Sequence, residues 1–239
     1  MRLRWSISTA VLSFGLALPA WAGLCQAPFM HDGGQTQLVG SGAMQLGADL
    51  AFSDVSKQGA NDCQARVRGV ARFGLAGLPP GKSSLDYFMV VRNGHASFER
   101  TDDQGQRVPV KGKFDLRMLG LFAYGDSSLR EGQTFPALRF QIDLDKKAVD
   151  TKPIVVHTTA KTVGARQVIQ TSAGEQSCWP INYTRRTEAT QASFSGLVLP
   201  IPATDSEVTD WFCSDLHMVM KQESRQNGIA SQVEVTRLQ

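Results

Sequence analysis

The chain has 239 residues, of which 42% are hydrophobic and 20% are charged. This balance is that of an ordinary globular protein and argues against a disordered, collagen-like or coiled-coil chain. The formal net charge of +3 gives no electrostatic reason to propose a nucleic-acid partner.

The N-terminus has the three-part pattern of a secretory signal peptide. Arg2 and Arg4 supply positive charge, an apolar run follows from Ile7 to Leu18, and Ala20-Trp21-Ala22 places small residues two apart. The pattern predicts cleavage after Ala22, and loss of the two arginines lowers the net charge from +3 to +1. The apolar run is shorter than the roughly 20 residues that a spanning helix needs. We therefore expect an exported mature chain without a transmembrane segment.

Four cysteines follow the predicted cleavage site, two near each end of the mature chain. In an exported protein, an even number of cysteines predicts disulfides. Three pairings are possible, and we favour the local ones, Cys25–Cys63 and Cys178–Cys213, which would each stabilise the fold by roughly 3–4 kcal/mol. Leu24 stands where lipid attachment at Cys25 requires a small residue, so we expect no lipid anchor. Only His217 lies at ligand spacing from a cysteine, and one such pair predicts no metal site.

The first half of the mature chain contains segments with the two-residue periodicity of strands. Small or apolar residues alternate with polar and other residues from Gln64 to Leu75, which predicts a half-buried strand. Leu85–Val91 and Ala96–Arg100 flank Asn93-Gly94. An Asn-Gly pair between two such runs predicts a tight hairpin, because both residues readily adopt positive φ. Phe114–Tyr124 is the best candidate for a helix.

Most of the second half also reads as strands. Asn227-Gly228 predicts another tight hairpin, Pro180 predicts an edge strand or a bulge at its position, and Pro200 and Pro202 predict a loop. The strands that we expect are Phe135–Leu144, Ile154–Thr159, Thr162–Gln170, Gln176–Thr184, Val208–Cys213, His217–Glu223 and Ser231–Leu238.

These elements predict the fold class. About ten or more short strands, frequent turn signals and few helices are typical of an all-β protein whose curved antiparallel sheet forms an open or incompletely closed β-barrel. No linker rich in Pro, Gly or Ser interrupts residues 23–239, so we expect them to form one domain.

Two C-terminal segments resemble LolA-like and related uncharacterised envelope proteins of the periplasm. Residues 162–174, TVGARQVIQTSAG, are followed by Cys178 and resemble a strand–turn–strand pattern of these proteins. Residues 208–216, VTDWFCSDL, resemble the strand that precedes their final hairpin. The resemblance covers residues 162–238, about a third of the chain. It implies a periplasmic location and a curved, open barrel that often holds acyl chains or other lipophiles in its concave face beneath covering helices.

The same region contains side chains suited to a lipophilic ligand. Methionine and aromatic residues line adaptable apolar pockets, although they also pack ordinary cores. The period of two means that the candidates cannot all face one way. The candidate ligand-binding residues are Trp211, Phe212, Leu216, Met218 and Met220. We expect a non-catalytic protein that binds a lipophile or serves envelope maintenance, without a cofactor.

Two other functions are compatible with the sequence. Exposed strands can pair with a protein of the envelope, and Arg66, Arg68 and Arg72 on one strand face could meet an anionic partner or simply be solvated. A serine hydrolase would need Ser127 within hydrogen-bond reach of His217. We do not expect an enzyme, because the sequence has no Gly-x-Ser-x-Gly, His-Glu-x-x-His or Walker motif.

Overall fold

The protein is described from a computed structural model, which covers residues 23–42, 44–59, 61–75, 81–110, 121–122, 124, 128–142, 150–151, 154–194 and 197–239. The predicted signal peptide, residues 1–22, lies outside the described residues, as does Ser127. Of the helix candidate Phe114–Tyr124, only Leu121, Phe122 and Tyr124 are described.

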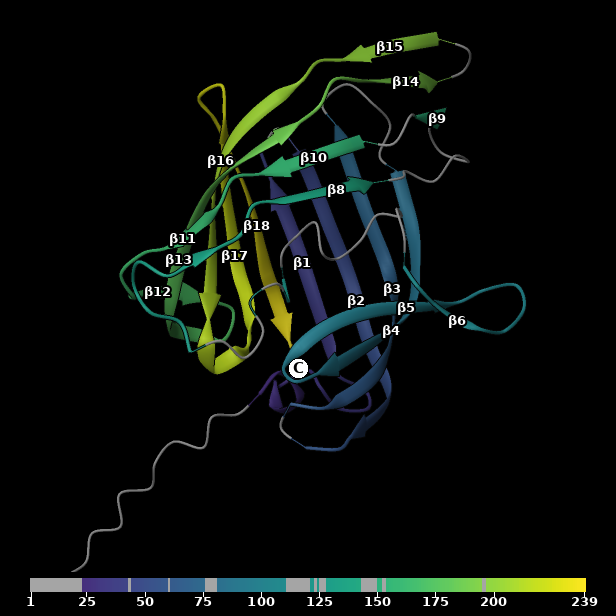
Figure 1. Ribbon diagram of the computed structural model, residues 1–239, viewed down its shortest axis with the longest axis vertical. Coiled ribbons are helices and arrows are strands. Elements are labelled where there is room, and N and C mark those ends of the chain that lie inside the picture. Colours follow the sequence, from purple (N-terminus) through teal and green to yellow (C-terminus); the bar gives the residue numbers. More distant parts are fainter. Residues whose placement is uncertain are drawn as a thin grey trace, which may run out of the picture.

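A 15-stranded antiparallel sheet dominates the molecule (Figure 1). Its strands are β1 (Gln35–Ser41), β2 (Met44–Lys57), β3 (Cys63–Leu75), β4 (Gly81–Arg92), β5 (His95–Thr101), β6 (Arg107–Pro109), β7 (Thr134–Phe135), β8 (Leu138–Ile142), β10 (Ile154–Thr158), β11 (Lys161–Val163), β12 (Gln167–Thr171), β13 (Gly174–Thr187), β16 (Thr204–Cys213), β17 (Met218–Gln226) and β18 (Ile229–Leu238). A second sheet contains β9 (Asp150–Thr151), β14 (Thr190–Phe194) and β15 (Leu197–Ile201). Two 3₁₀ turns, η1 (Leu24–Gln26) and η3 (Ser214–Leu216), are the helical elements with described bounds.

The strand order shows that the large sheet is open. It runs β6-β5-β4-β3-β2-β1-β18-β17-β16-β13-β10-β8, so β6 and β8 form the two ends of the path and do not pair with each other. In Figure 1, β8 and β10 lie in front of β1 and β2, so the path curves back over itself. The predicted class, an all-β protein with an open antiparallel sheet, is confirmed.

The first and last strands, β1 and β18, join the two halves of the large sheet. The first half is β1 to β6, and the second half is β7, β8, β10 to β13 and β16 to β18. β1 pairs with β18 from Thr36 opposite Leu238 to Ser41 opposite Gln232. Backbone hydrogen bonds between Gln35 and Gln239 in both directions extend this pairing. The seam places the first described strand beside the end of the chain, so the hydrogen-bonded ladder continues from one half into the other.

Both Asn-Gly hairpins have the predicted geometry. Asn93 and Gly94 have φ values of 49° and 76°, and Asn227 and Gly228 have φ values of 48° and 79°. Positive φ at both central residues gives the turn a twist that matches the twist of its flanking strands. These turns connect β4 to β5 and β17 to β18.

Several strand predictions need correction. Pro180 is not on an edge strand, because β13 pairs with β16 on one side and with β10, β11 and β12 on the other. The alternative prediction, a bulge, agrees with the register: the chain advances from Val163 to Gln167 while the opposing β13 advances one residue fewer, from Ile181 to Cys178. The β11 and β12 ladders stop on either side of Pro180, where its carbonyl accepts a hydrogen bond from the Gly164 N–H. The missing N–H of proline therefore breaks no ladder bond. The predicted strand Thr162–Gln170 is likewise two strands, β11 and β12.

Two further boundaries differ from the prediction. Pro200 is not in a loop: it lies in β15, at the edge of the smaller sheet, where a missing N–H is tolerated. His217 is not in a strand, because it caps η3 in the left-handed conformation with φ of 53°. β17 begins only at Met218.

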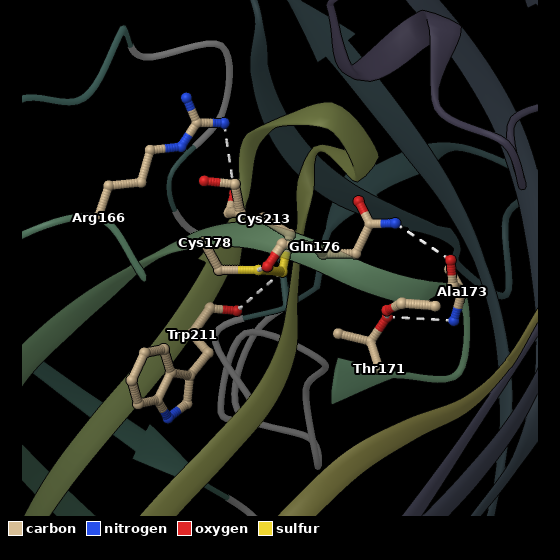
Figure 2. Close-up of a disulfide and its surroundings, with 9 residues drawn as sticks. Arg166, Thr171, Ala173, Gln176, Cys178, Trp211 and Cys213 are labelled. Carbon is tan, nitrogen blue, oxygen red and sulfur yellow. Dashed lines mark hydrogen bonds between the residues drawn. A yellow bond between two sulfur atoms is a disulfide. The ribbon is translucent and has the colours of Figure 1, made fainter. Parts of the chain in front are cut away.

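Two disulfides tie the chain to itself, Cys25–Cys63 and Cys178–Cys213. They are the local pairings that the sequence analysis favoured. Cys25 lies in η1 and Cys63 begins β3, so the first bond fixes the N-terminal segment to the sheet. Figure 2 shows the second bond beside Trp211, where it joins the directly opposed residues of β13 and β16. The described residues contain no free cysteine.

Candidate functional site

The buried faces of the two halves of the sheet meet an inner segment of the chain. We define the inner segment by its four described apolar residues, Leu121, Phe122, Tyr124 and Leu129, all of which are buried. None of the four lies in a strand. The inner segment touches both halves of the sheet, so the sheet curves around it and its buried face is concave.

The first half of the sheet presents an aromatic row to the inner segment. Phe29 lies 4.9 Å from Phe52 of β2 and 5.6 Å from Phe122, measured between ring centroids. Phe98 of β5 lies 6.2 Å from Phe122 and 6.0 Å from Tyr87 of β4. These spacings are typical of favourable aromatic pairs. Phe122 thus bridges the N-terminal segment and β5.

The second half of the sheet surrounds Tyr124. The Tyr124 ring lies 5.7 Å from Phe212 of β16 and 5.1 Å from Phe135 of β7, between centroids. Leu129 and Ile181 belong to the same buried cluster. The Leu121 carbonyl also accepts a hydrogen bond from the Val219 N–H at 3.0 Å.

A polar group lies in the middle of this apolar surface. Asp210 of β16 has no exposed surface. Its carboxylate accepts hydrogen bonds from the Tyr124 hydroxyl at 2.5 Å and from the Gln222 amide at 2.7 Å. The Tyr183 hydroxyl lies 3.4 Å away. A buried carboxylate requires such partners, because desolvation without them is costly.

Lys161 completes the polar cluster. Its ammonium nitrogen lies 3.1 Å from the Tyr124 hydroxyl oxygen and 3.8 Å from Asp210 Oδ2. The same nitrogen lies 4.3 Å from the centroid of the Tyr183 ring, within the range of a cation–π contact. We call Tyr124, Lys161, Tyr183, Asp210 and Gln222 the Asp210 cluster.

Burial shifts the proton affinities in the Asp210 cluster. It lowers the pKa of Lys161 from its usual value of 10.5, and the nearby Asp210 charge partly offsets this effect. It raises the pKa of Tyr124 and Tyr183 above 10.0, and the Asp210 charge adds to the rise. Both tyrosines therefore keep their hydroxyl protons at neutral pH and remain donors.

The structure divides the predicted ligand-binding residues between two buried clusters. Leu216, Met218 and Met220 are buried with the aromatic row in one cluster, against which the half-buried Trp211 packs. Phe212 lies in the other cluster, beside Tyr124. Lys161, Asp210 and Gln222 were not predicted as site residues from the sequence. A charged residue in an alternating strand gives no signal of burial. The register of β16 and β17 places Gln222 opposite Asp210, and the pairing of β11 with β13 brings Lys161 to them.

The arginines of β3 are paired with acidic residues. The Arg66 guanidinium makes two 2.8 Å hydrogen bonds to Asp86, and Arg68 lies 3.7 Å from the same carboxylate. Arg72 lies 2.6 Å from Asp49. These pairs are exposed, and the arginine hydrogen bond lowers the pKa of Asp86. The acidic partners and the exposure of these pairs indicate a solvated outer face.

His217 of the hydrolase hypothesis caps η3, and Ser127 lies outside the described residues. Within the described part of the chain, no three His, Cys, Asp or Glu residues gather as metal ligands. Likewise, no described helix has the length and hydrophobicity to span a membrane.

Comparison with known proteins finds similarity in structure. No family model matches the chain, and no curated protein matches it significantly. A solved structure of a "putative lipoprotein" from Parabacteroides distasonis has a TM-score of 0.52 at 12% identity, covering 89% of this chain and 98% of its own.

Two further solved structures are less similar. A "putative exported protein with YmcC-like fold" from Bacteroides fragilis has a TM-score of 0.48 at 11% identity, over 87% of this chain and 96% of its own. A "beta-barrel-like protein" of a domain of unknown function, DUF1849, from Brucella abortus has a TM-score of 0.34 at 10% identity, over 86% of this chain and 95% of its own. The TM-score of 0.52 shows that the Parabacteroides protein shares its fold with this chain, and 12% identity shows nothing beyond the fold.

Proposed function

We propose that this protein is an exported, non-catalytic protein of the periplasm that holds a lipophilic ligand against the concave face of its open sheet. The observation that carries the proposal is the inner segment. Its apolar side chains occupy the space between two buried sheet faces without forming a strand there. An acyl chain offers the same faces an equivalent apolar surface.

The energies of the two occupants are similar. Burying one large apolar side chain contributes roughly 1.5–3 kcal/mol, so the four side chains of the inner segment contribute roughly 6–12 kcal/mol. A chain of about 12 carbons contributes roughly 9 kcal/mol at about 0.8 kcal/mol per methylene. An exchange between them is close to balance, which suits a protein that takes up and releases its ligand.

The location is supported by the chemistry of the chain. Two disulfides are typical of proteins that mature in an oxidising compartment. The pattern of residues 1–22 is typical of the signal peptides of exported proteins.

Uptake of an apolar dye tests the proposal. Residues 23–239, produced through the export route, are extracted with organic solvent, refolded and titrated with N-phenyl-1-naphthylamine, which fluoresces in apolar surroundings. We expect saturable uptake, and brominated dodecanol should quench Trp179, which packs against the buried cluster that contains Tyr124 and Phe212. A Val168→Ser variant should bind equally, because Val168 is 66% exposed on β12. Absence of both uptake and quenching would reject a carrier.

A second candidate function is pairing with an envelope protein through β8. This strand ends the path of the large sheet, and its Leu138 is 49% exposed. An exposed edge of this kind can accept a strand from a partner. A photo-crosslinker placed at the exposed Gln141 of β8 should then capture one specific envelope protein in whole cells, and the same crosslinker at the exposed Glu207 of β16 should not.

A further inference from the structure

The Tyr124 hydroxyl makes two opposite kinds of hydrogen bond at once. It donates to Asp210 Oδ2 at 2.5 Å and accepts from the Lys161 ammonium at 3.1 Å. A hydroxyl group can do both, because it carries one proton and two lone pairs. The space between Asp210 and Lys161, which the Tyr124 hydroxyl occupies, therefore suits the hydroxyl group of any molecule that replaces the inner segment.

Charged head groups fit this position less well. A carboxylate or phosphate could accept from Lys161, but it would place a second negative charge beside Asp210. An ammonium could donate to Asp210, but it would face Lys161. Asp210 has no exposed surface and Lys161 is 6% exposed, so water screens neither repulsion effectively.

The rest of the Asp210 cluster keeps other contacts when Tyr124 leaves. The Gln222 amide still donates to Asp210 Oδ1 at 2.7 Å, and the Tyr183 hydroxyl lies 3.4 Å from the same oxygen. Lys161 keeps its contact with the Tyr183 ring. All four residues lie on strands of the large sheet, so they remain in place when the inner segment is displaced.

We infer that the ligand is an amphiphile whose uncharged, hydroxyl-bearing head group takes the place of the Tyr124 hydroxyl between Asp210 and Lys161. This inference rests on the proposed function and names the class of ligand for the same face. The apolar tail occupies the space of the Tyr124 ring and of its neighbours Leu121, Phe122 and Leu129. The inner segment is then an internal mimic of the ligand.

Three probes with the same tail test the head group. Dodecan-1-ol, dodecanoate and dodecylammonium compete with N-phenyl-1-naphthylamine for the wild-type protein at about pH 8, where the free carboxylic acid is ionised and the free amine is protonated. We expect the alcohol to bind at least about tenfold more tightly than either charged probe, because like charges placed together cost several kcal/mol.

Two variants and one control locate the effect. Tyr124→Phe should raise the affinity for the alcohol, because the competing inner segment loses both polar contacts. Asp210→Asn should bring dodecanoate to within about threefold of the alcohol by removing the nearby negative charge. Asp49→Asn makes the same change in a carboxylate on the outer face, where Arg72 and Gln37 contact it, and should leave the order of the probes unchanged.

The outcomes separate the two levels of the proposal. If all three probes displace the dye equally, or if dodecanoate binds best, the head-group assignment is wrong while lipophile binding stands. If the dye never binds and brominated dodecanol does not quench Trp179, both are wrong. If Asp210→Asn does not fold, the order of the wild-type affinities and the response of Tyr124→Phe still decide.

Discussion

Asp210 is held as a buried carboxylate by residues from four separate parts of the chain. Tyr124 comes from the inner segment, Lys161 from β11, Tyr183 from β13 and Gln222 from β17. Such a network fixes the positions of its members. If one partner leaves, a buried donor or acceptor loses its hydrogen bond, which costs free energy in an apolar environment.

The two tyrosines of this network predict a loss of stability at alkaline pH. The pKa of both hydroxyls is raised in the folded protein, so above about pH 10 the unfolded chain releases these protons while the folded chain keeps them. The free energy of unfolding should therefore fall as pH rises through this range. Urea unfolding measured from about pH 8 to 11 should show a shallower fall for Tyr124→Phe. An identical slope in both proteins would contradict this origin. Lys161, whose lowered pKa acts in the opposite direction, is present in both.

Gly69 of β3 lies at a position where the neighbouring strand leaves no room for a side chain. A Cβ atom placed on Gly69 would lie 2.0 Å from the Asp49 carbonyl oxygen, because β2 and β3 approach closely there. Gly69→Ala should destabilise the protein by about 1–3 kcal/mol or more through overpacking. Gly47→Ala is the matched control in β2, where the nearest atom lies 3.4 Å from the added Cβ. Thermal unfolding measures the melting temperatures of the two variants, and we expect that of Gly69→Ala to be lower. Equal melting temperatures would show that β3 can shift to admit the methyl group without loss of stability.

At the scale of elements, the sequence predicts strands best where alternation and turn chemistry agree. β3, β4 and β5 follow from period-two patterns around Asn93-Gly94, and β17 and β18 flank the second Asn-Gly turn. β1 and β2 were not predicted from the sequence. β2, MQLGADLAFSDVSK, contains Gly, Ala, Asp and Ser, which have low strand propensity, and it becomes a strand because β1 and β3 pair with it on both sides.

The candidate site was less predictable than the fold. Its apolar residues gave a pattern that could equally indicate an ordinary core. Its polar residues are far apart in sequence: the hydrogen-bonded pair Tyr124 and Asp210 alone has a sequence separation of 86. Only the strand register and the path of the inner segment bring them together.

The two disulfides predict different local effects. Cys25–Cys63 closes a loop with a sequence separation of 38 and is the covalent link between η1 and β3. Replacing both cysteines with alanine should cost about 3–4 kcal/mol in the chain-entropy model. Amide hydrogen exchange should become faster over residues 24–31.

The matched control is the double variant Cys178→Ala, Cys213→Ala. It removes the disulfide that joins the paired strands β13 and β16. Here the backbone ladder persists on one side of the bond, so the local increase in exchange should be smaller. Faster exchange at β13 and β16 than over residues 24–31 would contradict the predicted order.

At the scale of the whole molecule, the β1–β18 seam predicts cooperative unfolding. The seam carries the backbone ladder from one half of the sheet to the other, and apolar clusters extend across the inner segment. Trp179 and Trp211 report on the second half by fluorescence, while hydrogen exchange in β2, β3 and β4 reports on the first. For residues 23–239, both probes should give the same urea midpoint. Two separate midpoints would mean that each half folds on its own.

The unpaired margins of the sheet have a consequence for what the molecule can hold. A closed barrel has a girth fixed by its number of strands and their shear, so its interior volume cannot change without breaking ladder bonds. Here β6 and β8 are the ends of an open path. The circumference can therefore widen or narrow by bending alone, and one scaffold can fit cargoes of unequal bulk while every strand keeps its neighbours.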